Sequence, residues 1–116
     1  MPPSSRSASP IVHFDVSGPE LASLVSFYTE LFGWRVEASE GYAQVRTGTD
    51  LRGGLVEAEE SNVNLGVQVD DLEVALDRAE QLGGTIEMPA TDNGWVVKAQ
   101  VRDPAGNVVS LIQSDK

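Results

Sequence analysis

The feature that most limits the fold of this 116-residue chain is an internal repeat. Residues 43–46, Ala-Gln-Val-Arg, return unchanged as residues 99–102, 56 positions later. Around both copies the order of patterns is the same: an alternating strand, an apolar stripe at helical spacing that ends in glycine, and further short strands. The repeat predicts two copies of one supersecondary unit, over residues 10–60 and 61–114.

The first half opens with an alternating strand over residues 11–16, and an apolar stripe at helical spacing follows over residues 21–32. Gly33 is placed to end this helix, because glycine adopts the left-handed conformation of a C-terminal cap. Ser17 and Glu20 have the spacing of a capping box, so we expect them to cap the helix at its start.

The second half repeats this order with a strand over residues 64–69, a helical stripe over residues 72–82 and Gly83 at its end. Residues 70–73, Asp-Asp-Leu-Glu, again have the form of a capping box. Matched helix starts and ends in both halves make chance an unsatisfactory explanation for the repeated tetrapeptide.

The predicted fold class is α+β, with two tandem βαβββ units. Each helix can cover only one face of its own sheet, and the strands carry polar side chains on the other face. We therefore expect the two units to form a curved mixed sheet around an open cleft in which a ligand is surrounded. Residues 1–9 are rich in proline and serine and predict a disordered tail, which leaves residues 10–116 as a single domain.

Composition excludes several classes of function. The formal charge of −10 repels nucleic acid, and no run of Lys and Arg in the sequence compensates for it locally. The absence of cysteine excludes disulfides, thiolate catalysis and Cys-ligated metal. No apolar run approaches the roughly 20 residues of a membrane span, so we expect a cytoplasmic protein with no membrane partner.

One motif points to a known family. Residues 103–107, Asp-Pro-Ala-Gly-Asn, form a turn before an apolar strand over residues 108–112. This turn resembles the vicinal oxygen chelate superfamily, which includes glyoxalases, extradiol dioxygenases and bleomycin-resistance proteins. Residues 27–34, with Phe-Tyr and Phe-Gly-Trp, and the glycine pair at 53–54 are similar to the same superfamily. Residues 13–16, His-Phe-Asp-Val, resemble a glyoxalase-like branch that commonly lacks the metal ligands.

The resemblance implies where a metal would be bound. Metal-dependent members use a His at the start of each unit's first strand and a Glu or His on each unit's last strand, and the ion chelates two substrate oxygens. Here these positions are occupied by Ile11, Asn64, Ser110 and one of residues 54–57. We therefore expect no metal and no cofactor. His13 and Glu57 are weak metal candidates, because a β-bulge could shift His13 into a ligand position.

Strand parity selects the residues expected to contact a ligand. The candidates on the open faces are His13, Tyr42, Gln44, Gln100 and Ser110. Trp95, which follows Asp-Asn-Gly in a predicted loop, is expected to add an aromatic wall, whereas Trp34 is expected to pack under the first helix. Arg46 and Arg102 are expected to point to solvent at strand ends.

Two functions stay open at this point. The first is a metal-independent protein that binds a small organic molecule in the cleft. The second is an enzyme of the same superfamily, a lyase, isomerase or dioxygenase, with rearranged metal ligands or with His13 as a base. His13 could also be purely structural. A single two-unit domain leaves sheet edges exposed, so we expect a homodimer.

Overall fold

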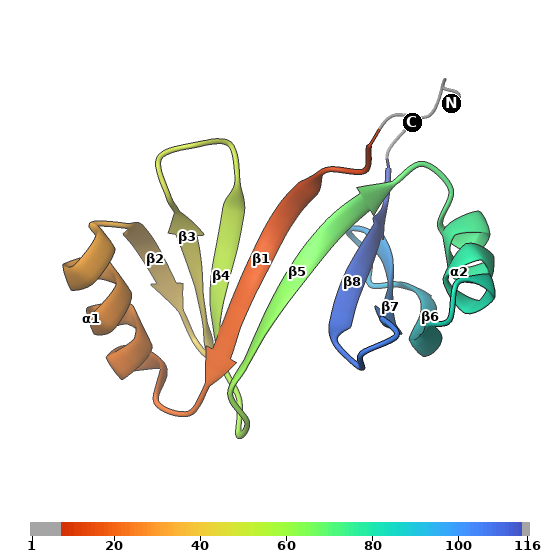
Figure 1. The fold of residues 1–116 in the computed structure, drawn as a ribbon. Coiled ribbons are helices and arrows are strands. Elements are labelled where there is room, and N and C mark those ends of the chain that lie inside the picture. Colours follow the sequence, from red (N-terminus) through yellow and green to blue (C-terminus); the bar gives the residue numbers. More distant parts are fainter. Residues whose placement is uncertain (1–7, 115–116) are drawn as a thin grey trace. The chain divides into compact units, whose positions relative to one another are not determined.

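The computed structural model describes residues 8–114 (Figure 1). The tail predicted for residues 1–9 lies outside the described residues except for its last two. In chain order the elements are β1 (Ile11–Gly18), α1 (Leu21–Phe32), β2 (Arg35–Ser39), β3 (Tyr42–Arg46), β4 (Arg52–Glu57), β5 (Asn62–Val69), α2 (Leu72–Gln81), β6 (Thr85–Asp92), β7 (Val97–Arg102) and β8 (Val108–Gln113). Neither helix in the described range is long and apolar enough to cross a membrane.

The fold class of residues 8–114 is α+β, as predicted, with two helices and an open mixed sheet. Neighbouring strands follow the order β2-β3-β4-β1-β5-β8-β7-β6, in which β1 and β4 are parallel and β2, β3 and β4 are antiparallel in turn. The described chain divides into two compact units. Val12–Gly66 is called here the N-terminal unit, and residues 8–11 with 67–114 the C-terminal unit.

The core of the N-terminal unit lies between α1 and one face of its strands. Its buried residues are Leu21, Ala43, Val45 and Leu55. Because side chains alternate along a strand, the residues between them point to the opposite face, called here the open face. Trp34 packs against this core and stacks on Tyr28 with ring centroids 5.3 Å apart, which confirms the prediction that Trp34 lies under the first helix.

The strand residues in the core of the C-terminal unit repeat those of the first unit. Its buried residues are Leu72, Leu76, Ala99, Val101 and Leu111. Ala99, Val101 and Leu111 stand 56 positions after Ala43, Val45 and Leu55. The duplication read from the sequence is therefore also a duplication of core packing, and an offset of 56 relates the last two strands of each unit.

The first helix begins differently from the prediction. β1 runs on to Gly18 and pairs there with Glu57, so Ser17 is a strand residue and is too early to cap α1. Glu20 precedes the helix with a left-handed φ of 62° and makes no side-chain cap. Instead Glu57 Oε1 accepts a hydrogen bond of 2.9 Å from the backbone N–H of Leu21. The Ser17–Glu20 capping box is therefore wrong.

The second helix begins in a related way. Gln113 Oε1 accepts a hydrogen bond of 2.8 Å from the N–H of Leu72, and Gln113 stands 56 positions after Glu57. Asp71 is the N-terminal cap and accepts from the N–H of Val74 at 3.2 Å, one residue later than the predicted box over 70–73. In both units the last strand thus supplies an acceptor to the helix.

Candidate functional site

Polar side chains converge on the open face of the N-terminal unit around a glycine. Gly54 on β4 lies opposite Asp15 on β1 and opposite Gln44 on β3. A Cβ atom at Gly54 would lie 2.7 Å from Asp15 Oδ1 and 2.8 Å from the Tyr42 hydroxyl oxygen. Such distances are closer than van der Waals contact, so only glycine lets Asp15 and Tyr42 approach each other across β4.

The surroundings of Tyr42 keep its side chain neutral. Burial raises the pKa of the Tyr42 phenol above its ordinary value of 10.0, and the negative charge of Asp15 raises it further. Both effects disfavour the phenolate, so the group remains an O–H donor at physiological pH. Within the described part of the chain this hydroxyl has no hydrogen-bond partner, which leaves it available to a ligand.

His13 stands beside Asp15 on the same face of β1. Its Nδ1 lies 3.5 Å from Asp15 Oδ2, and the two side chains are 31% and 38% exposed. A carboxylate at Nδ1 orients the imidazole ring and leaves Nε2 to donate, accept or transfer a proton. β1 keeps an unbroken register with β4 from His13 to Gly18, so over these positions no bulge moves His13 toward the predicted metal position.

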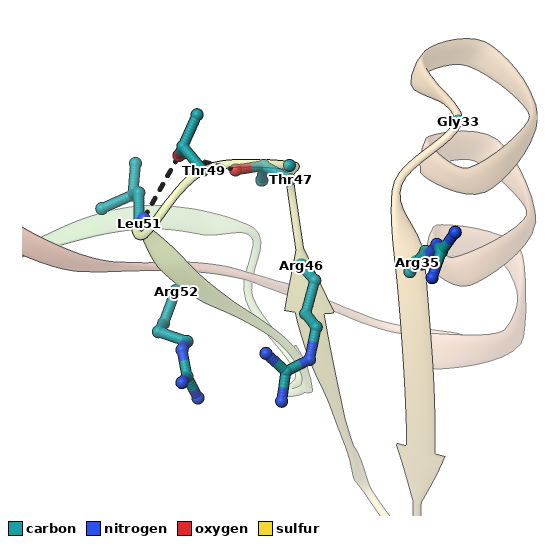
Figure 2. Close-up of a pocket in the computed structure, with 8 residues that line it drawn as sticks. Gly33, Arg35, Arg46, Thr47, Thr49, Leu51 and Arg52 are labelled. Carbon is teal, nitrogen blue, oxygen red and sulfur yellow. Dashed lines mark hydrogen bonds between the residues drawn. The ribbon is translucent and has the colours of Figure 1, made fainter.

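His13 and Tyr42 are among the residues that line a hollow of about 190 Å³ on the N-terminal unit. Its lining residues are His13, Tyr42, Gln44, Val45, Arg46, Arg52 and Gly53. A second hollow of about 350 Å³ shares Arg46 and Arg52 with the first and extends to the loop between β3 and β4 (Figure 2). Three of the predicted ligand contacts, His13, Tyr42 and Gln44, are therefore brought together in one unit.

The other predicted contacts belong to the C-terminal unit. Gln100 on β7 lies opposite Ser110 on β8, and its Nε2 donates to Ser110 Oγ at 3.4 Å. Trp95 is 92% exposed in the loop between β6 and β7, as the Asp-Asn-Gly sequence before it predicted. Asn93 Oδ1 holds this loop by accepting from the N–H groups of Trp95 and Val96, each at 3.0 Å.

The metal candidates lie on different faces of the N-terminal sheet. Glu57 shares the helix-covered face with buried Leu55 and bonds to the start of α1, whereas His13 is on the open face. The two cannot bind one ion together. Residues 56 positions apart are equivalent in the two units, so Glu57 corresponds to Gln113 and Gly54 corresponds to Ser110. Because Ser110 is at a metal-ligand position of the superfamily, Gly54 is at the equivalent position of the first unit. Gly54 has no side-chain donor.

No other set of donors replaces these positions. Among residues 8–114, no three His, Cys, Asp or Glu side chains gather closely enough to hold a metal ion. The residues present thus do not fit the ion that metal-dependent members of the superfamily bind, because such an ion needs several imidazole or carboxylate ligands at once.

Sequence reasoning missed three members of the site. The sequence shows Asp15 only as a neighbour of His13, and Gly54 only as half of a glycine pair and as one of residues 54–57 at a metal-ligand position. Arg52 was not considered. The signal for Gly54 was present in principle, because a glycine inside a strand often marks a close approach of side chains or a ligand, but the residues it admits follow only from the register.

Comparison with known proteins identifies the family of this chain. A glyoxalase-like domain matches residues 11–112 of this chain. The chain belongs to the glyoxalase-like domain family. This match and the solved structures below confirm the predicted vicinal oxygen chelate superfamily. A search of curated proteins found no match for this glyoxalase-like chain.

Solved structures share the glyoxalase-like fold at low sequence identity. A glyoxalase/bleomycin resistance protein/dioxygenase superfamily member from Vibrio splendidus 12B01 is 16% identical, with a TM-score of 0.72 over 92% of this chain and 100% of that one. Methylmalonyl-CoA epimerase from Mycobacterium tuberculosis is 14% identical, with a TM-score of 0.66 over 91% and 88%. The 2,2',3-trihydroxybiphenyl 1,2-dioxygenase of Sphingomonas wittichii RW1 is 20% identical, with a TM-score of 0.71 over 95% of this chain and 42% of that one.

Proposed function

We propose that this glyoxalase-like protein binds a small organic molecule on the open face of the N-terminal unit, and that it does so without a metal ion. The observation that carries the proposal is the convergence of Asp15 and Tyr42 over Gly54, beside His13 and Gln44. A fold whose strands needed only stability would gain from a larger residue than glycine at an interior strand position. Here the glycine instead creates space for polar groups.

The chemistry of these groups favours a ligand that carries oxygen atoms. A neutral Tyr42 phenol donates a hydrogen bond, the Gln44 amide donates and accepts, and the imidazole Nε2 of His13 does either. Relatives in the superfamily include an enzyme named for methylmalonyl-CoA and one named for a trihydroxybiphenyl. Oxygenated molecules are therefore a suitable first set of ligands to test.

The residues at the superfamily's metal positions support metal independence. The four superfamily positions hold Ile11, Gly54, Asn64 and Ser110. None of these supplies an imidazole or a carboxylate, which are the usual protein ligands of zinc, iron, nickel and manganese. Protein purified from metal-supplemented medium should hold well under one equivalent of divalent ion by elemental analysis. A stoichiometric metal would contradict the proposal.

The site itself can be tested by a screen of small oxygenated molecules against ¹⁵N-labelled protein. Ligands should shift the amide signals of His13, Tyr42, Gln44 and Gly54. Tyr42→Phe removes one donor and should weaken binding by about 0.5–1.5 kcal/mol, which is roughly a two- to thirteenfold loss. Tyr28→Phe is the matched control, because Tyr28 packs in the core with Trp34 and should leave affinity unchanged.

A stronger variant is Gly54→Ala. Its added Cβ overlaps Asp15 and Tyr42, so it should displace both side chains and abolish binding. Ligands that bind Gly54→Ala and wild type equally, or that shift signals only in the C-terminal unit, would refute the site. The screen then reports where the true contacts lie.

A further inference from the structure

Three arginines form a row across the open face of the N-terminal unit. Arg35 on β2 lies opposite Arg46 on β3, and Arg46 lies opposite Arg52 on β4. All three share one face, because each alternates with a residue of the core or its border, such as Val36 and Val45. Arg52 in turn lies opposite His13 on β1. Three of the chain's eight basic residues thus gather in one place on a chain of net charge −10.

No carboxylate of residues 8–114 forms an ion pair with this row. In the described range the only ion pairs are His13 with Asp15 and Arg102 with Glu87. Glu37 follows Arg35 on the same face of β2, and Asp50 lies in the adjoining loop, but neither pairs with an arginine of the row. Like charges directly opposite each other on neighbouring strands destabilise a sheet, so the row is a cost to the fold by itself.

The duplication supplies an internal comparison. At the equivalent places in the C-terminal unit, Thr85 lies opposite Arg102, and Arg102 lies opposite Val108. These three places hold one arginine instead of three, and Glu87 holds Arg102 at 2.7 Å while the Gly106 carbonyl accepts from it at 2.8 Å. The same strand arrangement therefore forms without the extra charges. Formation of these strands thus does not require the three arginines of the N-terminal row.

The row borders a hollow whose size and lining side chains suit an anionic group. The hollow of about 350 Å³ is lined by the three arginines and by the loop between β3 and β4, including Thr47 and Thr49. Figure 2 shows the side chains of Arg46 and Arg52 extending in the same direction from neighbouring strands, with Arg35 on the next strand. Arginine forks bind phosphate and carboxylate oxygens through paired N–H groups, and threonine hydroxyls add single donors.

We propose that this row is an anion-binding subsite, and that the ligand of the open face carries a phosphate or carboxylate group. The anion lies against Arg35, Arg46 and Arg52, and the rest of the molecule extends toward Tyr42 and Gln44, because the two hollows share Arg46 and Arg52. The position of that remainder rests on the proposed function, whereas the anion subsite rests on the arginines alone. A net charge of −10 opposes polyanions, so the ligand is a small molecule.

The test titrates inorganic phosphate and, separately, malonate into ¹⁵N-labelled protein at constant ionic strength, with sodium chloride as the ionic control. Saturable shifts of the Arg35, Arg46 and Arg52 signals with one or both anions are expected. Arg46→Gln and Arg52→Gln should each weaken binding about tenfold or more, because each removes a charged donor pair. The anion that binds more tightly distinguishes a phosphate from a carboxylate ligand.

The matched control is Arg78→Gln. Arg78 is on the exposed surface of α2, where it bonds to Gln81, and its loss changes the net charge by the same amount. If Arg78→Gln weakens anion binding as much as Arg46→Gln does, or if chloride shifts the same signals to the same extent, the subsite is refuted. Melting curves in anion-free buffer guard against misfolding: Arg46→Gln should melt at or above the wild-type temperature, since it removes a repulsion.

Failure of the subsite and failure of the proposed function give different results. An organic ligand that binds Arg46→Gln as tightly as wild type would overturn the anion subsite and leave the proposed function standing. If phosphate or malonate binds specifically but no organic ligand shifts the signals of Tyr42 or Gln44, the anion subsite stands and the proposed function is overturned.

Discussion

Gly54 determines how close Asp15 and Tyr42 come, and so determines the electrostatic environment of the phenol. The sequence alone placed Tyr42 and Gln44 on the open face correctly, because strand alternation needs no knowledge of neighbours. It could not show that Asp15 reaches Tyr42, since the two residues are on strands that are not adjacent to each other. The missing side chain on the strand between them leaves room for both to occupy the space above Gly54.

The raised pKa of Tyr42 can be tested by absorbance titration. In Tyr28→Phe protein Tyr42 is the remaining tyrosine, and it should ionise above 10.0 in the folded state. Asp15→Asn should lower the pKa only partly, because burial is the larger cause and persists. Since the unfolded chain loses this proton first, stability should be fully present below pH 10 and should fall as the pH rises further. A Tyr42 that titrates at 10.0 in folded protein would contradict the described environment.

At the scale of elements, both helices take an acceptor from the last strand of their own unit. Glu57 lies 36 residues from Leu21 in sequence, and Gln113 lies 41 residues from Leu72. Local patterns predicted both helices and the glycine at the end of α1, because periodicity and glycine conformation are local properties. The cap of α1 was misplaced because its acceptor comes from a distant strand, which no local motif reveals.

Replacing Glu57 tests this contact. Glu57→Ala leaves the N–H of Leu21 without its acceptor and should lower the free energy of unfolding by about 1 kcal/mol. Glu57→Gln should cost less, because glutamine already serves in the equivalent place at Gln113. Urea denaturation measures both, with exposed Glu59→Ala as a charge-matched control. Equal effects of Glu57→Ala and Glu59→Ala would mean that the contact contributes nothing.

At the scale of the molecule, the sequence predicted the fold class, the duplication and the superfamily, because these depend on patterns spread over the whole chain. It did not reveal the arginine row, whose three members are separated in sequence and meet only through strand register. The linear sequence has no basic cluster, but the folded N-terminal unit has one, so the prediction from the sequence is wrong for this unit. A search along the linear sequence does not detect charged residues that come together from different strands.

The predicted homodimer belongs to this scale as well. β2 and β6 stand at the two ends of the strand order, and among residues 8–114 no strand pairs with the outer edge of either. On α1, Phe27, Leu31 and Phe32 are each more than half exposed. Covering such surfaces favours association, so light scattering at micromolar concentration should give twice the 12.4 kDa chain mass. A mass of 12.4 kDa across that range would exclude the dimer.

The paired positions of the two units also make this chain a ready template for protein design. Thr85→Arg and Val108→Arg, combined with Glu87→Gln to release Arg102, would copy the N-terminal row onto strands that share its register. The N-terminal unit thereby shows which substitutions would give the C-terminal unit the same row of arginines. The internal repeat thus places two different sets of side chains on the same strand register, and each set shows what that register can carry.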